Sequence, residues 1–214
     1  LAQAHSSAVS SIFAEPCPTM RAVVVGGARA LPPFVYHPGY SCPWPAEHRF
    51  PMWKFKDLHA HLEELGLATE ANVHRPIERP PDEWFLAVHE EAYYRSVVSG
   101  TLAEAAQRRI GFGGEMRKPE LIRRTVLECA GTVLAVQLAL RHGLAANLAG
   151  GTHHAHRDFG SGFTILNDLA IAAMWAREFG VVRRVAIVDL DVHQGDGTAA
   201  IFADNSDATP SVFF

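Results

Sequence analysis

The stretch VRRVAIVDLDVHQGDG, residues 182–197, decides the fold. Its first nine residues form a mostly apolar run rich in β-branched side chains, which is typical of a strand buried in a parallel sheet. Side chains alternate along a strand, so we expect Asp189, Asp191 and His193 to share one face. Because ligands of open α/β sheets bind beyond the carboxyl ends of the strands, the stretch predicts a functional site there.

Two carboxylates and an imidazole that converge on one face favour a bound cation, because the carboxylates would otherwise repel one another. A set of Asp and His ligands suits zinc or iron. The alternative is a turn at the strand end, in which the Asp side chains accept hydrogen bonds from nearby backbone amides. Three polar residues in register favour the metal interpretation.

A second polar motif, GGTHHAHRDFGSGF at residues 150–163, follows another predicted strand, ANLAGG at 146–151. Adjacent residues on an extended backbone point apart, so His153 and His154 are not expected to bind one ion together. They suit two imidazoles that flank a reaction centre, each with a carboxylate that fixes its tautomer. A purely structural histidine pair is the alternative. The neighbouring HR dipeptide, residues 156–157, is expected to be solvated.

The rest of the chain alternates helical and strand-like patterns, which indicates an α/β fold with a mainly parallel sheet. A short strand, FVYH at 34–37, precedes a proline-rich loop. Helices are expected at 57–65, at 82–99, at 120–142 between Pro119 and Gly143, and from an Asn167 N-cap to Gly180.

Composition excludes some partners. The chain has 19 basic and 23 acidic residues, so it lacks the positive charge of a general nucleic-acid binder. The longest uncharged stretch of the central helix, Cys129 to Leu140, is 12 residues and too short to span a membrane. Three scattered cysteines favour an intracellular location, in the cytoplasm or nucleus. Residues 1–30 are rich in Ala, Ser and Val and are expected to be a leader or an organelle transit segment.

Together, GGTHHA (150–155), SGF-x₃-ND (161–168) and DLDVHQGDG (189–197) resemble the histone deacetylase family, including its bacterial acetoin-utilisation-type members. The segment YHPGYSCPWPAEHRFPMWKFKDL (36–58), with RRIGFG and NLAGG, is similar to the bacterial and class IV branch. The resemblance covers about residues 31–214, which would be the N-terminal part of the family's domain. It implies an arginase-like three-layer α/β/α fold, incomplete at the C-terminus, with zinc as the metal.

The resemblance implies a role for each of eight residues. In chain order these are His153 and His154 as the tandem catalytic histidines, Gly162 and Phe163 as a wall of the acyl-lysine tunnel, Asp189 and Asp196 as carboxylate partners of the two histidines, and Asp191 and His193 as two of three zinc ligands. Asp189 and the backbone near the zinc ligands also match a potassium site. Phe112 is a candidate for the opposite tunnel wall, and Arg49 for an arginine near an internal acetate channel.

The implied activity is zinc-dependent hydrolysis of the acetyl or acyl amide of lysine side chains. His154 with Asp196 would be the general base and acid, and His153 with Asp189 the electrostatic partner. The family's third zinc ligand and its transition-state tyrosine have no counterpart before Phe214, so activity of this chain alone is expected to be impaired. The alternatives are a non-catalytic fragment or pseudo-enzyme, a deacetylase of small acylated amines, and an arginase-type ureohydrolase, which needs more metal-binding carboxylates. The oligomeric state is left open.

Overall fold

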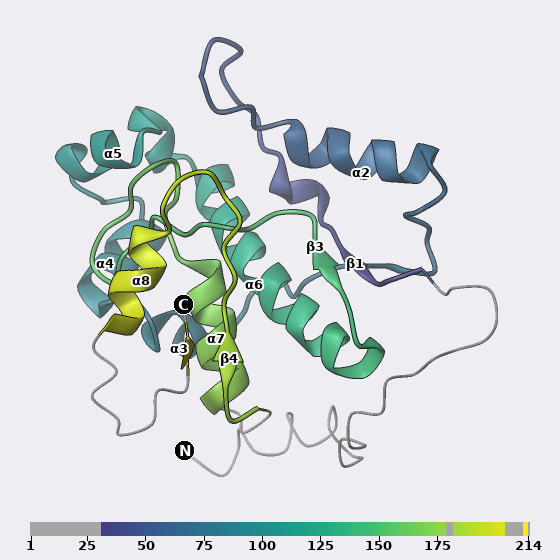
Figure 1. Ribbon diagram of the computed structural model, residues 1–214. Coiled ribbons are helices and arrows are strands. Elements are labelled where there is room, and N and C mark those ends of the chain that lie inside the picture. Colours follow the sequence, from purple (N-terminus) through teal and green to yellow (C-terminus); the bar gives the residue numbers. More distant parts are fainter. Residues whose placement is uncertain (1–30, 179–181, 204–211, 214) are drawn as a thin grey trace. The chain divides into compact units, whose positions relative to one another are not determined.

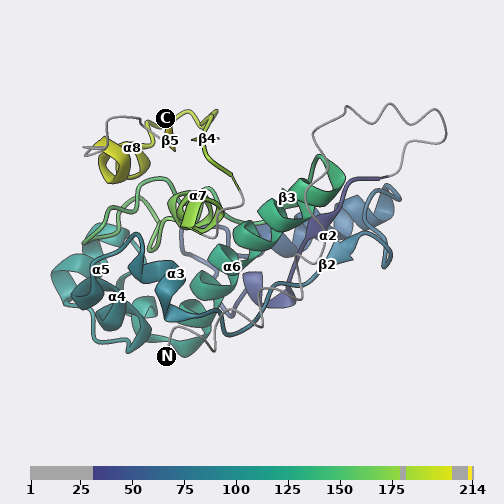
Figure 2. The ribbon, with the colours of Figure 1, turned by 90° about the horizontal axis from the view of Figure 1, so that it is seen from below.

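A computed structural model describes residues 31–178, 182–203 and 212–213 of the chain (Figure 1). The expected leader, residues 1–30, lies outside the described residues. In the described part, the long helix α6 (Pro119–His142) is the central element. The views in Figures 1 and 2 place α2 and a three-stranded sheet on one side of α6, and helices α3, α4, α5, α7 and α8 on the other.

The remaining helices are short. They are η1 (Pro38–Tyr40), α2 (Lys54–Glu64), α3 (Asp82–Leu86), α4 (Glu91–Val98), α5 (Glu104–Ile110), η2 (Gly113–Arg117), α7 (Asp168–Glu178) and α8 (Asp196–Ala203). In the described part of the chain, no helix is both long enough and apolar enough to cross a membrane.

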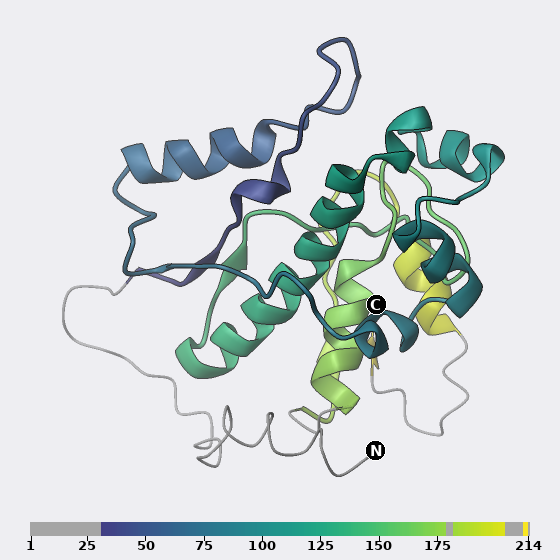
Figure 3. The same cartoon turned by 180° about the vertical axis from the view of Figure 1, so that it is seen from behind.

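Helices α6 and α7 pack against each other and form the core beneath the site, as the view from behind also shows (Figure 3). The predicted limits of α6 are confirmed, because Pro119 occupies its first turn and Gly143 ends it with a positive φ of 82°. Leu127 of α6 and Ile171 of α7 are completely buried in one hydrophobic cluster. The predicted cap of α7 is confirmed as well, since Asn167 Oδ1 accepts the Ala170 N–H at 2.9 Å.

The described strands are short and all their pairings are parallel. Strand β1 (Phe34–Val35) lies between β2 (Val73–His74) and β3 (Ala146–Asn147), and β4 (Val185–Ala186) pairs with β5 (Val212–Phe213). This confirms the mixed α/β class with parallel strands. Among the described residues, the strands form two separate sheets, of three and two strands.

The single helix expected at 82–99 is wrong, because tertiary hydrogen bonds interrupt it between α3 and α4. His89 turns inward, where its Nε2 accepts the Asn167 N–H at 3.0 Å and its Nδ1–H donates to the His156 carbonyl at 2.9 Å. The Glu90 N–H donates to the Arg157 carbonyl at 2.9 Å. Hydrogen bonds of His89 and Glu90 to residues 156, 157 and 167 thus take the place of the helical hydrogen bonds that would join α3 to α4. The end expected for α7 at Gly180 lies outside the described residues.

The strand expected at 182–190 is also shorter than predicted, since only Val185 and Ala186 form a ladder. Beyond them, Asp side chains bind the backbone two residues ahead. Asp189 Oδ1 accepts the Asp191 N–H at 2.9 Å, and Asp191 Oδ1 accepts the His193 N–H at 2.7 Å. Such turns compete with a β-ladder for the backbone donors.

Candidate active site

The first histidine of the pair is held by a carboxylate from the distant Asp motif. His153 Nδ1 lies 2.6 Å from Asp189 Oδ2, and the ring is buried. The carboxylate requires the proton on Nδ1, which leaves Nε2 as the free lone pair. The His153 carbonyl accepts the Thr198 N–H at 3.0 Å, so the first turn of α8 is bound to the histidine segment.

The second histidine makes an equivalent pair. His154 Nδ1 lies 2.6 Å from Asp196 Oδ1, and the two imidazole rings are 4.2 Å apart between centroids, tilted by 50°. The expectation that adjacent histidines point apart is wrong. The backbone there is a turn rather than a strand, with the His153 N–H bonded to the Gly151 carbonyl at 2.9 Å and the Ala155 N–H to the Thr152 carbonyl at 3.3 Å. The turn brings both imidazoles to one side.

Both carboxylates are held in the ionised form. Partial burial raises the pKa of Asp189, but hydrogen bonds from His153 and the Asp191 N–H outweigh it, and the net pKa lies below its usual value. Burial likewise raises the pKa of Asp196, but the hydrogen bonds from His154 and the Gly197 N–H, with the electrostatic effect of His154 and His156, together outweigh it, and the net pKa is lowered. Two ionised carboxylates thus fix the tautomers of two neighbouring imidazoles.

The proposed metal ligands lie beside the first histidine. Asp191 Oδ1 is 3.9 Å from His153 Nε2 and 2.9 Å from His193 Nδ1, and the rings of His193 and His154 are 5.9 Å apart. The two sequence motifs therefore meet, as predicted. Side chains of Asp191 and His193 are 51% and 72% exposed. The turn that was weighed as the alternative to a metal site is present too, because Asp191 also caps the His193 backbone.

The Asp191 and His193 side chains are of the type that binds zinc, but they are fewer than a catalytic zinc site needs. Carboxylate oxygen and imidazole nitrogen are ordinary zinc ligands, and a catalytic zinc usually has three protein ligands. Asp191 and His193 offer two converging donor atoms. Across residues 31–178, 182–203 and 212–213, no group of three His, Cys, Asp or Glu side chains is arranged to hold a metal ion. The zinc assignment of the pair stays a prediction, and so does the potassium site at Asp189.

The GF pair of the predicted tunnel wall has an unusual backbone. Gly162 and Phe163 have φ values of 54° and 63°, and Phe163 is the one non-glycine residue with positive φ in the described part of the chain. A Cβ on Gly162 would lie 2.5 Å from Cδ2 of His154, so glycine lets the wall touch the imidazole. The Phe163 N–H donates to the Ile110 carbonyl at 2.8 Å and fixes the strained residue.

Neither Phe112 nor Arg49 takes the position that the resemblance suggested. Phe112 is 2% exposed and packs against Phe163 with ring centroids 5.5 Å apart, so its side chain is buried next to Phe163 and does not form an exposed opposite wall. Arg49 is exposed, and its guanidinium carbon lies 5.5 Å from the centre of the Phe163 ring. This contact puts Arg49 at the aromatic wall rather than in a buried channel.

The expectation that residues 156–157 are solvated polar residues is wrong for the partly buried His156, whereas Arg157 is exposed as expected but also forms two hydrogen bonds. His156 stacks on Phe159 with centroids 4.1 Å apart, and its Nδ1 lies 3.1 Å from the His154 carbonyl. Arg157 donates to the Val88 carbonyl at 3.1 Å and to the Ile201 carbonyl at 2.7 Å. The His156 side chain thus contacts its own segment, whereas Arg157 binds that segment to Val88, just after α3, and to α8.

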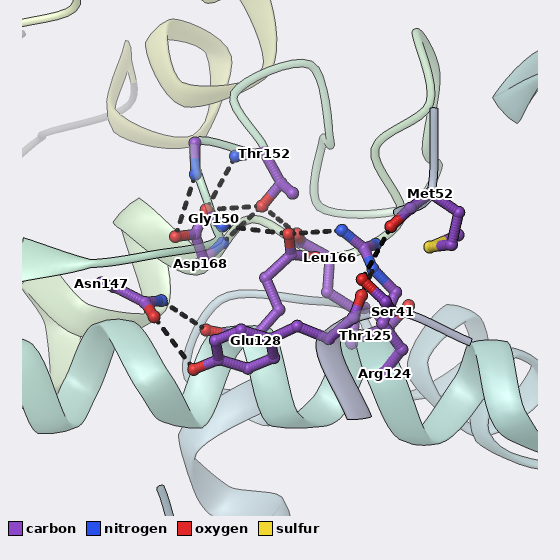
Figure 4. A network of polar contacts seen from close by, with 12 residues as sticks. Ser41, Met52, Arg124, Thr125, Glu128, Asn147, Gly150, Thr152, Leu166 and Asp168 are labelled. Atoms are coloured by element: carbon purple, nitrogen blue, oxygen red, sulfur yellow. Dashed lines mark hydrogen bonds and ion pairs between the residues drawn. The ribbon is translucent and has the colours of Figure 1, made fainter. Parts of the chain in front are cut away.

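Sequence reasoning missed a buried polar network beneath the histidines (Figure 4). Glu128 of α6 is buried and forms an ion pair with Arg124 at 2.7 Å, and Asp168 of α7 is buried nearby. Burial raises the pKa of Glu128, although the Arg124 guanidinium opposes this. The available signal was a lone carboxylate in the apolar stripe of the 120–142 helix, close to Leu127.

Comparisons with known proteins identify the family of this chain. The histone deacetylase domain model matches residues 48–214. An uncharacterized protein of Picosynechococcus is 51% identical over 181 residues, which cover 85% of this chain and 58% of the relative. Histone deacetylase 2 of Arabidopsis thaliana is 30% identical, over 74% of this chain and 42% of its own, and the acetoin utilization protein AcuC of Staphylococcus aureus is 31% identical, over 75% and 46%.

Solved structures give the same result for the fold. The HDA15 HD domain has a TM-score of 0.66 at 21% identity, covering 84% of this chain and 51% of that domain. A deacetylase homologue from Aquifex aeolicus has a TM-score of 0.63 at 23% identity, and a homologue complexed with SAHA has 0.64 at 26%, each over 85% of this chain and 49% of the other. The arginase-like α/β fold of these proteins is therefore the fold of this chain.

The fold places the chain among arginase-like α/β proteins, and the matched domain specifies the family. This chain belongs to the histone deacetylase family. It spans about half the length of the curated relatives that it matches.

Proposed function

We propose that this chain contributes the histidine half of the active site of a zinc-dependent deacetylase that hydrolyses the acetyl or acyl amide of lysine side chains. One observation carries the proposal. Two imidazoles, each bound to its own carboxylate at 2.6 Å, lie side by side with Asp191 3.9 Å from the first of them. An amide hydrolase needs such a proton carrier next to the site where the carbonyl is polarised.

The second histidine is assigned the proton transfer. His154 has its Nδ1 proton bound to Asp196, so its Nε2 can take a proton from water and return it to the leaving amine. His153 is more deeply buried and has Asp189 as partner, which suits an electrostatic role beside the reacting carbonyl. Phe163 would contact the aliphatic part of the acyl-lysine side chain.

Asp191 and His193 are the residues that would hold zinc, together with a further ligand. Zinc, when bound there, would supply Lewis-acid polarisation of the carbonyl and acidify the attacking water. A set of oxygen and nitrogen donors supports this choice of metal, and the short distance between the two donor atoms supports their sharing one ion.

The proposal is tested with the natural full-length protein, loaded with zinc and assayed on an acetyl-lysine peptide. We expect the natural protein to hydrolyse the peptide and SAHA to inhibit this hydrolysis. In His154→Ala the rate should fall about 10²–10⁴-fold. His61→Ala is the control, because His61 is an exposed residue of α2. Equal activity of His154→Ala and the natural protein would refute the proposal. Hydrolysis of small acylated amines with no activity on the peptide would place the substrate in that class instead.

A further inference from the structure

We infer that Asp168 and Glu128, two buried carboxylates on different helices, are positioning residues that set the backbone from which His153 and His154 project. The inference rests on the proposed function. It concerns the segment directly before the histidines, residues 150–152, whose three consecutive N–H groups all donate to these two carboxylates.

Asp168 binds two of the three donors. Its Oδ1 accepts the Thr152 N–H at 2.8 Å, and its Oδ2 accepts the Gly151 N–H at 3.2 Å. The Thr152 hydroxyl lies 2.6 Å from Oδ1 and accepts the Asp168 N–H at 2.9 Å. Asp168 and Thr152 thus bind each other through backbone and side chain, and both are buried. This reciprocal pairing leaves the peptide before His153 few alternative orientations.

Glu128 binds the third donor. Its Oε1 accepts the Gly150 N–H at 3.0 Å and the Arg124 Nη2–H at 2.7 Å. Arg124 also donates from Nε to the Tyr40 carbonyl at 3.2 Å, so the ion pair is anchored at both ends. The buried Glu128 carboxylate therefore has two partners: the Arg124 guanidinium balances its charge, and the Gly150 N–H of the histidine segment donates a hydrogen bond to it (Figure 4).

A line of side-chain bonds connects Asp168 to the sheet. Thr132 on α6 lies 2.6 Å from Asp168 Oδ2 through its hydroxyl, which accepts from Asn147 Nδ2 at 2.9 Å. Asn147, in β3, accepts the Tyr40 hydroxyl proton at 2.9 Å. Helices α6 and α7 and strand β3 therefore all fix the position of one carboxylate.

The arrangement matters because the imidazoles have little freedom of their own. The His153 N–H is bonded to the Gly151 carbonyl, so rotation of the peptide at Gly151 or Thr152 moves the turn that carries both rings. Each ring is also bound to its carboxylate at 2.6 Å. A displacement of about 1 Å at reacting groups can lower a rate about 10²-fold. Substitutions of Asp168 or Glu128, which act on the imidazoles through this backbone, should therefore change kcat more than KM.

The test compares two threonine hydroxyls of α6, the partly buried Thr132 and the buried Thr125, in the natural full-length protein with zinc. Thr132→Val removes the hydroxyl bound to Asp168, and Thr132→Ser restores it. Thr125→Val is the control on the same helix, because the Thr125 hydroxyl is buried and donates to the Leu121 carbonyl at 3.0 Å instead of to Asp168 or Glu128. Asp168→Asn is the stronger change, since the amide leaves the Gly151 and Thr152 N–H groups and the Thr132 hydroxyl without a charged acceptor.

We expect kcat to fall about tenfold in Thr132→Val and about 100-fold in Asp168→Asn, with KM and zinc content within twofold of the natural protein. Thr132→Ser should restore kcat, and Thr125→Val should leave it unchanged at a similar loss of thermal stability. Equal kcat in Thr132→Val and Thr125→Val would overturn the inference. So would a loss of activity that follows only thermal stability or zinc content.

A second readout does not depend on activity. The Nδ1 protons of His153 and His154, bound to carboxylates at 2.6 Å, should give downfield proton resonances in NMR spectra. We expect these resonances to shift in Thr132→Val and to be unchanged in Thr125→Val. Unchanged resonances in both variants would overturn the positioning role. The two proposals can fail separately. If the natural protein is inactive on every acyl-lysine peptide but the resonances still shift in Thr132→Val, the proposed function is refuted and the positioning role is supported.

Discussion

The two halves of the candidate site are held by different kinds of interaction. In the histidine segment, residues 150–154, the N–H groups of residues 150–152 are bound by buried carboxylates of α6 and α7. The Asp segment, residues 187–193, is shaped by aspartates that bind their own neighbouring backbone. Its apolar side chains Val188, Leu190 and Val192 are 78%, 90% and 92% exposed. The candidate proton-transfer groups are thus fixed by the interior, whereas the candidate metal ligands lie on a segment fixed mainly by local turns and by their contacts to the histidines.

The largest expected effect separates the chemical roles of the two halves. In the natural full-length protein, His154→Ala should keep stoichiometric zinc and lose turnover by about 10²–10⁴-fold. Asp191→Ala and His193→Ala should each lose zinc, because each removes a ligand. Metal content measured by mass spectrometry beside kinetic constants distinguishes the cases. A zinc-free His154→Ala protein would contradict the assignment of His154 as proton carrier.

The next effect tests the interior that supports the histidine segment. Leu127→Ala in α6 should lower the free energy of unfolding by about 2–5 kcal/mol, since Leu127 is completely buried and its truncation leaves a cavity. Urea denaturation followed by circular dichroism measures the change. A loss below about 1 kcal/mol would show that this part of the core relaxes around the cavity.

A pH effect of similar size comes from the same interior. Burial lowers the pKa of His89 from 6.5 to about 4, despite hydrogen bonds to the Arg157 and His156 carbonyls, and the Arg157 charge also disfavours a proton. As the pH falls, His89 takes up a proton in the unfolded state before it does so in the folded state. The contribution of neutral His89 to the free energy of unfolding is therefore fully present above pH 6.5 and is lost as the pH falls toward 4. The shift corresponds to about 3 kcal/mol.

Unfolding curves collected between pH 7 and pH 4 check this prediction. His89→Gln, which offers one donor and one acceptor without a titration, should flatten that dependence. His61→Gln on the exposed face of α2 is the control and should keep it. An unchanged slope in His89→Gln would assign the dependence to other groups.

The smallest expected effect completes the comparison. Leu190→Ala in this chain should change the free energy of unfolding by less than about 0.5 kcal/mol, because the side chain is 90% exposed. Both variants replace leucine with alanine, so the difference between their free energies of unfolding reflects the burial of the two positions. A cost near that of Leu127→Ala would show that the Asp segment packs in solution as firmly as the core.

The sequence predicted the parts of the fold that depend on local chemistry. The limits of α6 follow from Pro119 and Gly143, and the cap of α7 from Asn167, because each acts on its own helix. The class of fold was also predicted. The two motifs meet as predicted, although among the described residues the strands before them, β3 and β4, lie in two separate sheets and not at one sheet edge. The site roles taken from the resemblance stay predictions, although the structure brings His153 and Asp191 together.

The remaining features depend on contacts between distant segments. The helix break at His89 is caused by bonds to residues 156 and 167, which no local pattern encodes. The convergence of the two imidazoles depends on a turn fixed by Asp168, which lies 15 residues beyond His153 in sequence. Phe112 was placed at a wall because it is aromatic, yet its burial beneath Phe163 is a matter of tertiary packing.

Gly197 has a consequence for how substitutions at this site would be tolerated. A Cβ at this position would lie 2.5 Å from the Ala155 carbonyl oxygen and 2.6 Å from the His154 carbonyl carbon, both of them backbone atoms that cannot move aside cheaply. One methyl group would act as a wedge between the helix that begins with Asp196 and the histidine it binds. In a saturation-mutagenesis library selected for activity, a position with no functional group would therefore rank among the least replaceable, as though it took part in the chemistry.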